Sequence, residues 1–304
     1  MVRRAPQHSA GITALAVNKA DPKFLQDFLA QKFSLSRRTA KAMIDGRSVW
    51  VNRKCVWIAR FELRTGDTVE VPAQVVKGAV RQGAVKTSGP VAPVTKRHVR
   101  VLWQNESYLI CDKPSGLVSC DDPKSAEALL REQEKIPTLE AVHRLDRDTT
   151  GCLLFAKNHA AHVAAVEVFK THKVSKIYQA IVRGRFPYAF RVIDTPIDGQ
   201  NAVSKVKCEL AGDDASFLRV RIETGRTNQI RRHLASVRCP IIGDRVFGLK
   251  SVRDPRMMQV PRQMLHAATL ELPDPLTPHE QIKAHAPLPA DFRATLRLFG
   301  LGKR

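Results

Sequence analysis

Residues 141–157 read AVHRLDRDTTGCLLFAK, and this stretch places charged residues directly before an apolar run. The run 152–156 follows Gly151 and is typical of a short buried strand. The loop that enters the strand contains Asp146 and Asp148. Catalytic groups are often found on loops held by such a scaffold, so a carboxylate here is a candidate nucleophile or general base.

The alternative is that these carboxylates are structural. Asp and Thr residues before a strand often do no more than bond neighbouring amides, and residues 148–151, DTTG, have the composition of such a turn. We assign Asp148 to that turn. A loop aspartate taken alone is more often structural or solvated than catalytic, so the role of Asp146 depends on the rest of the chain.

Three stretches together decide this question. They are HRLDRDTTG at 143–151, KIYQA at 176–180, and TGRTNQIRRHLA at 224–235 followed by PIIGD at 240–244. In this order they resemble the active-site, tyrosine and third motifs of the RluA-type family of pseudouridine synthases, which isomerise uridine to pseudouridine in RNA. With an N-terminal segment that resembles the S4 domain, the resemblance covers most of the chain.

The resemblance implies a role for one residue of each motif. Asp146 would be the catalytic carboxylate at the ribose, Tyr178 would stack on the uracil, and Arg231 would pair with Asp146. A guanidinium beside the carboxylate would keep it ionised and oriented. Without the resemblance, Tyr178 would be read as a core aromatic. Covalent addition at the anomeric carbon and proton removal to give a glycal both stay open.

Four further residues of the motifs are expected to bind substrate: His143, Arg144, Arg226 and Gln229. Arg144 is expected to fill the space left by a flipped uridine or to grip the flanking phosphates, at an unstacking cost of about a few kcal/mol. Asn228 stands where many relatives carry His, and we expect it to affect local packing or RNA contact. Isomerisation involves no redox change and adds no outside group, so we expect no cofactor.

The composition indicates a polyanionic partner. The chain of 304 residues has a formal net charge of +21, which favours nucleic acid as partner and predicts salt-sensitive binding. The six cysteines form no Cys-x-x-Cys pair and the ten histidines no metal-binding spacing, so neither a metal site nor a disulfide framework is predicted. No apolar run is long enough to span a membrane, and no signal peptide is evident. We expect a cytoplasmic monomer.

We expect an α+β protein in four parts. Residues 1–22 are predicted as a flexible basic tail, 23–72 as an S4-like module of two helices and short strands, and 73–98 as a basic linker. Residues 99–304 would form the catalytic domain, whose mixed and mainly antiparallel sheet with flanking helices is implied by the resemblance. The linker either orders along RNA or only tethers the two domains.

Basic residues are expected to supply the RNA-facing surfaces. Strand 217–222 is predicted to carry Arg219 and Arg221 on one basic face, across which RNA could lie. In the S4-like module the basic face would comprise Arg37, Arg38, Lys41, Arg47, Arg53 and Lys54.

The sequence therefore predicts isomerisation of specific uridines in structured RNA. Large-subunit ribosomal RNA is favoured because S4-bearing relatives often act there, and transfer RNA is the second choice. One rival is a non-catalytic S4-type RNA-binding or ribosome-assembly protein. Another is a metal-dependent hydrolase that uses Asp146 and Asp148, although a two-metal site would need more carboxylates than this loop offers.

Overall fold

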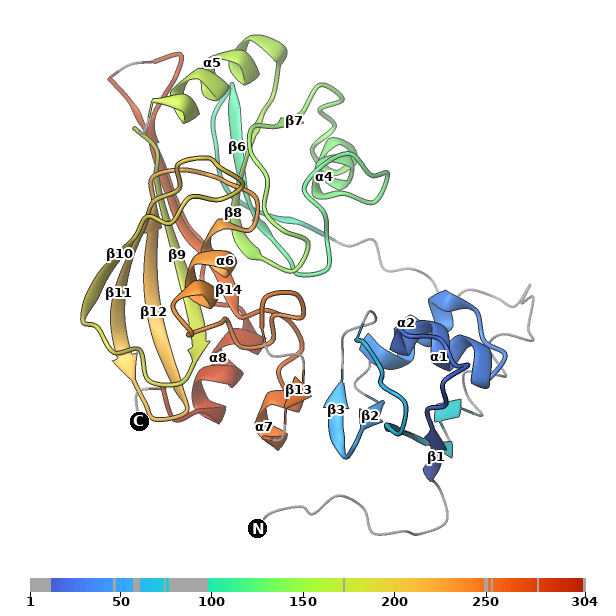
Figure 1. Ribbon diagram of the computed structural model, residues 1–304. Helices are drawn as coiled ribbons and strands as arrows, with labels where there is room; N and C mark the ends of the chain where they lie inside the picture. The colour runs from blue at the N-terminus through green and yellow to red at the C-terminus, as the bar shows by residue number, and fades with distance from the viewer. Residues whose placement is uncertain are drawn as a thin grey trace. The chain divides into compact units, whose positions relative to one another are not determined.

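The computed structural model describes residues 12–45, 48–56, 61–73, 75–76, 98–171, 173–248, 251–252, 254–277 and 279–302 (Figure 1). The chain divides into two compact units. The first comprises residues up to 92 together with 248–259, and the second comprises 93–247 together with 260–304. Most of the linker expected over 73–98, from residue 77 to residue 97, lies outside the described residues.

The first unit packs two helices against a small sheet. The helices are α1 (Leu25–Lys32) and α2 (Arg37–Asp45). The strands run in the order β1 (Ile12–Ala16), β4 (Thr68–Pro72), β2 (Trp50–Val51), β3 (Lys54–Val56) and β13 (Ser251–Val252). Leu25, Phe28 and Leu29 occupy one face of α1, at positions i, i+3 and i+4, and are fully buried. Helical spacing of apolar residues therefore produces this core.

Two segments of the first unit differ from the sequence-based expectation. Residues 12–16, placed in a flexible tail, form β1 and pair antiparallel with β4. The sequence ITALA gives a weak strand signal, because Thr and Ala differ little in hydrophobicity and the alternation of polar and apolar residues is unclear. Residues 248–259, placed in a continuous catalytic domain, belong to this unit, where β13 pairs with β3. A pairing between segments so distant along the chain leaves no local signal.

The second unit is built on a ten-stranded sheet. Eight strands follow the order β10 (Phe190–Ile193), β11 (Ser204–Ala211), β12 (Ala215–Ile222), β9 (Ser175–Arg183), β14 (Leu265–Pro273), β8 (Thr150–Ala156), β6 (Tyr108–Lys113) and β5 (Arg100–Gln104). In addition, β15 (Gln281–His285) pairs with β14, and β7 (Glu140–Ala141) pairs with β8. All pairings are antiparallel except β14 with β8, which confirms the mixed, mainly antiparallel α+β class.

The parallel pair joins the two halves of this sheet and fixes the loop before β8. It consists of only two register pairs, His266 with Thr150 and Ala267 with Gly151. Gly151 has φ +109°, and a Cβ atom there would overlap the carbonyl of Ala267. Only glycine tolerates this backbone geometry and this close approach, so the loop that ends at Gly151 is set by a seam between strands.

The helices of the second unit lie on the sheet (Figure 1). They are α4 (Ala126–Glu134), α5 (His159–Lys170), α6 (Gln229–Ser236) and α8 (Ala290–Leu298); the short α7 (Pro255–Met258) belongs to the first unit. The core beneath α5 includes Leu154 of β8 and Leu270 of β14, both almost fully buried. Burial of these side chains holds together the strands that carry the site described next.

Candidate active site

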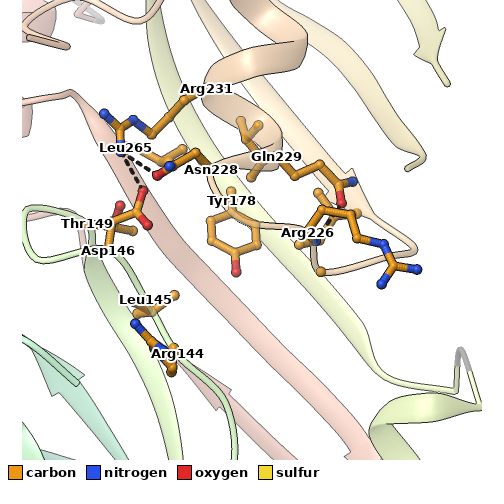
Figure 2. A pocket seen from close by; sticks show the side chains of 13 residues that line it. Arg144, Leu145, Asp146, Thr149, Tyr178, Arg226, Asn228, Gln229, Arg231 and Leu265 are labelled. Atoms are coloured by element: carbon orange, nitrogen blue, oxygen red, sulfur yellow. Dashed lines mark hydrogen bonds and ion pairs between the residues drawn. The ribbon is translucent and has the colours of Figure 1, made fainter. Parts of the chain in front are cut away.

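Three elements bring their polar side chains to one pocket (Figure 2). Asp146 lies on the loop before β8, Tyr178 on β9 and Arg231 on α6. The guanidinium Nη1 of Arg231 donates to Oδ2 of Asp146 at 2.9 Å. The side chain of Asp146 is 31% exposed and that of Arg231 only 9%. The pocket therefore presents a carboxylate that is held from its buried side.

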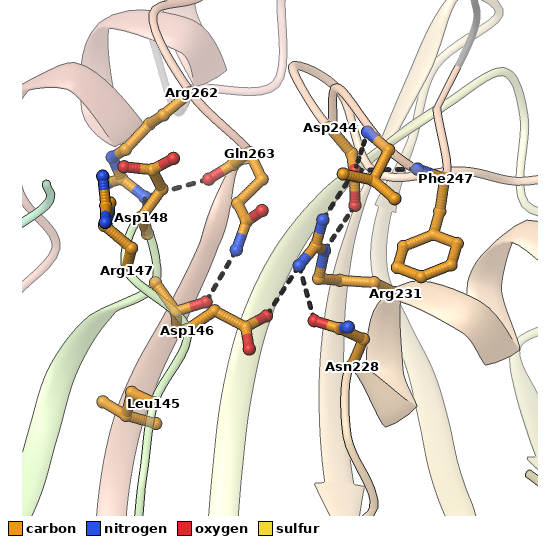
Figure 3. Close-up of polar contacts among 12 residues, drawn as sticks. Leu145, Asp146, Arg147, Asp148, Asn228, Arg231, Asp244, Phe247, Arg262 and Gln263 are labelled. Carbon is orange, nitrogen blue, oxygen red and sulfur yellow. Dashed lines mark hydrogen bonds and ion pairs between the residues drawn. The ribbon is translucent and has the colours of Figure 1, made fainter. Parts of the chain in front are cut away.

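Arg231 is itself anchored by a second carboxylate (Figure 3). Its Nε and Nη2 donate to the two oxygens of Asp244 at 2.6 and 2.9 Å, and its Nη1 also donates to Oδ1 of Asn228 at 2.6 Å. Burial lowers the pKa of Arg231, but the hydrogen bonds and charges of Asp244 and Asp146 outweigh it and raise the pKa. The arginine is a permanent cation with a fixed orientation.

The sequence alone did not identify Asp244 as a site residue. For Asn228 it predicted an effect on local packing or on RNA contact, without naming Arg231 as its partner. Both lie within the third motif, but nothing in the sequence shows that they bond Arg231. Asn228 has φ +55°, a conformation that Asn adopts more readily than most residues, and this turns its side chain toward the arginine. The expectation for Asn228 was therefore incomplete.

The loop that carries Asp146 is fixed by its backbone. The amide of Thr149 donates to the carbonyl of Asp146 at 3.0 Å, which closes a turn. Gln263 donates to the hydroxyl of Thr149 at 2.9 Å, and Arg262 donates to the carbonyl of Asp148 at 3.0 Å (Figure 3). These bonds act on the turn predicted over 148–151, and they position Asp146 without touching its carboxylate.

Lys113 fixes the same loop from the other side. It is fully buried at the end of β6, and its ammonium donates to the carbonyls of Pro114, Leu117 and Arg147 at 3.0, 2.6 and 2.9 Å. Burial lowers the pKa of Lys113 to about 8. Because all three protons are bonded to backbone oxygens, this lysine is structural.

Tyr178 forms the floor between Asp146 and Arg226 in the pocket (Figure 2). Its ring is buried, and its hydroxyl has no hydrogen-bond partner within the part of the chain that the structure describes. Burial raises the pKa of Tyr178, and the negative charge of Asp146 raises it further. The phenol is therefore neutral and offers a flat face and an uncommitted polar tip.

The basic face of β12 lies on the opposite side of the sheet. Val220 is directly opposite Tyr178 in the β12–β9 register, so the two share one face. Successive strand residues point to opposite faces, which directs Arg219 and Arg221 away from the pocket. Arg219 pairs instead with Glu209 at 3.2 Å. RNA that enters the pocket does not meet these two arginines there.

Two of the four expected substrate-binding residues are available for that role. Arg144 lines the pocket, is exposed, and its side chain makes no hydrogen bond or ion pair with any residue that the structure describes. Arg226 also lines the pocket and is exposed, and its Nε donates to the carbonyl of Asn201 at 3.0 Å. Both guanidinium groups retain donors that face solvent.

The structure does not support substrate binding by Gln229. Its side-chain oxygen accepts from the hydroxyl of Thr224 and the amide of Arg226, and its nitrogen donates to Val203 and Ser204. These four bonds use the full capacity of the amide. The side chain is only 3% exposed, and it therefore holds the loop before α6.

His143 is also occupied by the protein itself. Its Nε2 accepts from the amide of Leu154 at 3.2 Å, and its ring stacks on Phe169 with centroids 5.1 Å apart. Burial, together with the positive charge of Lys176, lowers the pKa of His143 to about 3. The imidazole is neutral, contacts β8 through Nε2 and still lines the groove beside Tyr178, so substrate binding by His143 stays a prediction.

The expected RNA-facing residues of the first unit are exposed wherever their side chains are described. Arg37 and Lys41 are one turn apart on α2, and Arg53 lies in the turn between β2 and β3. Arg37 pairs with Asp27 at 2.8 Å, and its side chain remains 76% exposed. Arg47 and the side chains of Arg38 and Lys54 lie outside the described residues.

The described residues contain neither a metal-binding cluster nor a membrane-spanning helix. No group of three His, Cys, Asp or Glu side chains in this part of the chain is arranged to hold a metal ion. In the same part, no helix combines the length and apolar character needed to cross a membrane.

Comparisons with known proteins identify the family of the chain. Residues 107–236 match the family model described as RNA pseudouridylate synthase, and residues 25–69 match the S4 domain. Ribosomal large subunit pseudouridine synthase D of Pseudomonas aeruginosa is 36% identical over 231 residues, covering 66% of this chain and 71% of that protein. The protein of the same name from Xanthomonas campestris pv. campestris is 32% identical over 300 residues, covering 87% of this chain and 84% of that protein.

A solved structure shares the fold. Human RNA pseudouridylate synthase domain containing 4 superimposes with a TM-score of 0.56 at 22% identity, covering 66% of this chain and 93% of that one. The family model and the two bacterial relatives place the chain among RNA-modifying isomerases. The chain belongs to the RluA-type family of RNA pseudouridine synthases, which confirms the resemblance seen in its three motifs.

Proposed function

We propose that the protein isomerises specific uridines of large-subunit ribosomal RNA and that Asp146 is the catalytic carboxylate. The observation that carries the proposal is the ion pair of 2.9 Å between Asp146 and the buried Arg231, at the wall of a pocket that also contains Tyr178. The RNA class is supported by the names of the Pseudomonas and Xanthomonas relatives, which specify the large ribosomal subunit.

The reaction breaks the bond between N1 of uracil and C1′ of ribose, rotates the base, and joins C1′ to C5. The proton lost from C5 replaces the lost bond at N1, so atoms balance without an outside reagent. Oδ2 of Asp146 is held by Arg231, whereas Oδ1 has no partner among the described residues. We assign Oδ1 to the reacting position, where it either adds at C1′ or removes the neighbouring ribose proton.

Tyr178 and Arg144 would handle the base. A neutral, buried phenol provides a flat surface on which uracil can stack while it is detached, and its hydroxyl can bond the base edge. Arg144 lies across the pocket from Arg231, and its guanidinium has no hydrogen-bond or ion-pair partner among the described residues (Figure 2). This placement supports a role in filling the stack after the uridine is flipped out.

The test is a map of pseudouridine in total RNA from cells with and without the gene, read as carbodiimide-dependent stops of reverse transcription. We expect a large-subunit site to disappear on deletion and to return with the wild-type gene but not with Asp146→Asn. Asp148→Asn, two residues away on the same loop, is the matched control and should restore the site. Restoration by Asp146→Asn would contradict the assignment.

The same map separates the rival readings. A lost site confined to transfer RNA would move the substrate assignment, and no lost site would favour a non-catalytic RNA-binding protein. A metal-dependent hydrolase would shorten RNA and stop in EDTA, whereas an isomerase leaves RNA length unchanged.

We also propose that the protein acts as a monomer in the cytoplasm. Its complete pocket is formed by one chain, which supports the monomer, and sedimentation of the protein alone tests it.

A further inference from the structure

Lys176 is a buried lysine that the proposed mechanism does not use. It lies on β9 two residues before Tyr178, so both side chains point to the same face of the sheet. Its residue exposure is only 9%, and its ammonium makes no hydrogen bond or ion pair with any residue in the described part of the chain. Its one recorded contact is the ring of Phe169, whose centroid lies 5.6 Å from the ammonium nitrogen.

The side chain of Lys176 is largely buried and its ammonium reaches the groove without a hydrogen-bond acceptor from any described residue, so part of its water is lost with no protein group to replace it. The aromatic face of Phe169 offsets only part of that loss. Burial accordingly lowers the pKa of Lys176. Lys113 differs, because its fully buried ammonium is bonded to three carbonyls. The protein supplies hydrogen-bond acceptors for the ammonium of Lys113, and the described residues supply none for that of Lys176.

The surroundings of Lys176 indicate which group could accept hydrogen bonds from its ammonium. It lines a groove of about 960 Å³ that also contains Asp146 and Tyr178, large enough to hold more than one nucleotide. The neighbouring wall consists of Phe169 and the neutral His143, which supply no negative charge. The carboxylate of Asp146 is already bonded to Arg231. Two further carboxylates line the groove, Asp121 and Asp122, but neither forms an ion pair with Lys176 in the described structure, which leaves a ligand in the groove to supply the anion.

We propose that the ammonium of Lys176 binds a phosphate oxygen of the RNA strand next to the uridine held at Tyr178. The two residues are about 6.6 Å apart along the strand, so a nucleotide stacked at Tyr178 places an adjacent phosphate within reach of a lysine side chain. A phosphate supplies the full negative charge and the acceptors that the buried ammonium lacks. This inference rests on the proposed function, because it requires RNA to enter this pocket.

The test measures binding separately from chemistry. In the catalytically inactive Asp146→Asn background, Lys176→Met keeps the length of the side chain and removes the charge. The ligand is a synthetic RNA fragment that the wild-type protein modifies, and its Kd is measured at several salt concentrations. We expect roughly tenfold weaker binding from loss of a charged hydrogen bond and a salt slope smaller by about 0.7 to 0.9. Lys176→Arg should retain most of the slope.

Two controls keep the result interpretable. Lys173→Met removes an exposed lysine three residues away and should leave the Kd within about twofold, because a solvated charge contributes little. Thermal unfolding of Lys176→Met should be unchanged or occur at higher temperature, since an uncompensated charge is removed, whereas Lys113→Met should unfold earlier. An early unfolding of Lys176→Met with unchanged RNA affinity would overturn the proposal and make Lys176 structural.

The remaining outcomes also decide the matter. If Lys176→Met binds RNA with the wild-type salt slope but slows turnover when Asp146 is restored, the ammonium acts on the base, and the phosphate contact is refuted. If the wild-type protein modifies the fragment and the slope is unchanged, only this inference fails. If the wild-type protein modifies no RNA, the proposed function itself has failed.

Discussion

Asp244 gives the sharpest prediction because it anchors Arg231, which in turn holds Asp146, the carboxylate proposed to be catalytic. The side chain of Asp244 is only 1% exposed, and its two oxygens accept from Arg231 at 2.6 and 2.9 Å. Its Oδ1 also accepts from the amides of Val246 and Phe247. In Asp244→Asn one oxygen becomes an NH₂ group, which would face a donor, and the charge that balances Arg231 inside the protein is lost.

The expected cost follows from this geometry. Removing one partner of a buried ion pair costs about 3–5 kcal/mol. Asp146 remains bonded to Arg231 at 2.9 Å, so we take the lower figure, about 3 kcal/mol. For a domain of this size each kcal/mol shifts Tm by about 2–4 °C, which predicts a fall of roughly 6–12 °C. Turnover should fall by about 10- to 100-fold, because a small displacement of Arg231 moves Asp146.

Thermal unfolding and single-turnover pseudouridine formation measure the two effects, and Asp146→Asn is the matched comparison. That variant leaves Arg231 bonded to Asp244 and changes a side chain that is 31% exposed. Its stability should fall by less than about 1 kcal/mol while turnover is abolished. The reasoning fails if Asp244→Asn unfolds within about 2 °C of the wild-type protein, or if Asp146→Asn is the more destabilised of the two.

Three further outcomes follow from other parts of the chain. Gly151→Ala should lower the free energy of unfolding by at least about 2 kcal/mol in urea, whereas Gly184→Ala, also at positive φ but facing open space, should cost only about 1 kcal/mol. Burial lowers the pKa of His266 to about 4, so stability should be lost as pH falls from about 6.5 toward 4. His266→Gln should reduce this loss in urea titrations at pH 7 and 4.5, and an unchanged pH dependence would exclude His266 as its source. Replacing three exposed S4 residues by Ser should weaken RNA binding and reduce its salt slope without changing Tm, and an unchanged slope would remove them from the interface: Arg37, Lys41 and Arg53.

Local patterns in the sequence were sufficient for some of the helices and strands. The apolar run after Gly151 predicted β8, and the pattern in 23–72 predicted two helices, which are present as α1 and α2. These predictions succeed because each depends on neighbouring residues alone. The pairing of Asp146 with Arg231, 85 residues apart, came from the family resemblance and not from any pattern that the residues themselves show.

Partner choice over long distances was not predictable in the same way. Gln229 and His143 belong to motifs and have side chains suited to bind RNA, yet both form hydrogen bonds with the backbone of the protein. Their residue types are equally compatible with either role, and only the position of the carbonyls and amides around them decides. The same limit explains why Asp244 was quoted as part of a motif without being recognised as the anchor of Arg231.

The two buried lysines show how the structure goes beyond that limit. Both lie in strands, Lys113 at the end of β6 and Lys176 in β9, and neither was predicted to be buried. The structure separates them, because Lys113 is bonded to carbonyls that fix the loop of Asp146, whereas Lys176 faces a groove and has no hydrogen-bond acceptor among the described residues. The side of the pocket behind Asp146 is thus fully bonded and rigid, whereas the side that faces RNA keeps its cations uncommitted. Substitutions behind Asp146 should therefore change stability and rate together, and substitutions on the open side should change affinity and salt dependence while leaving the fold intact.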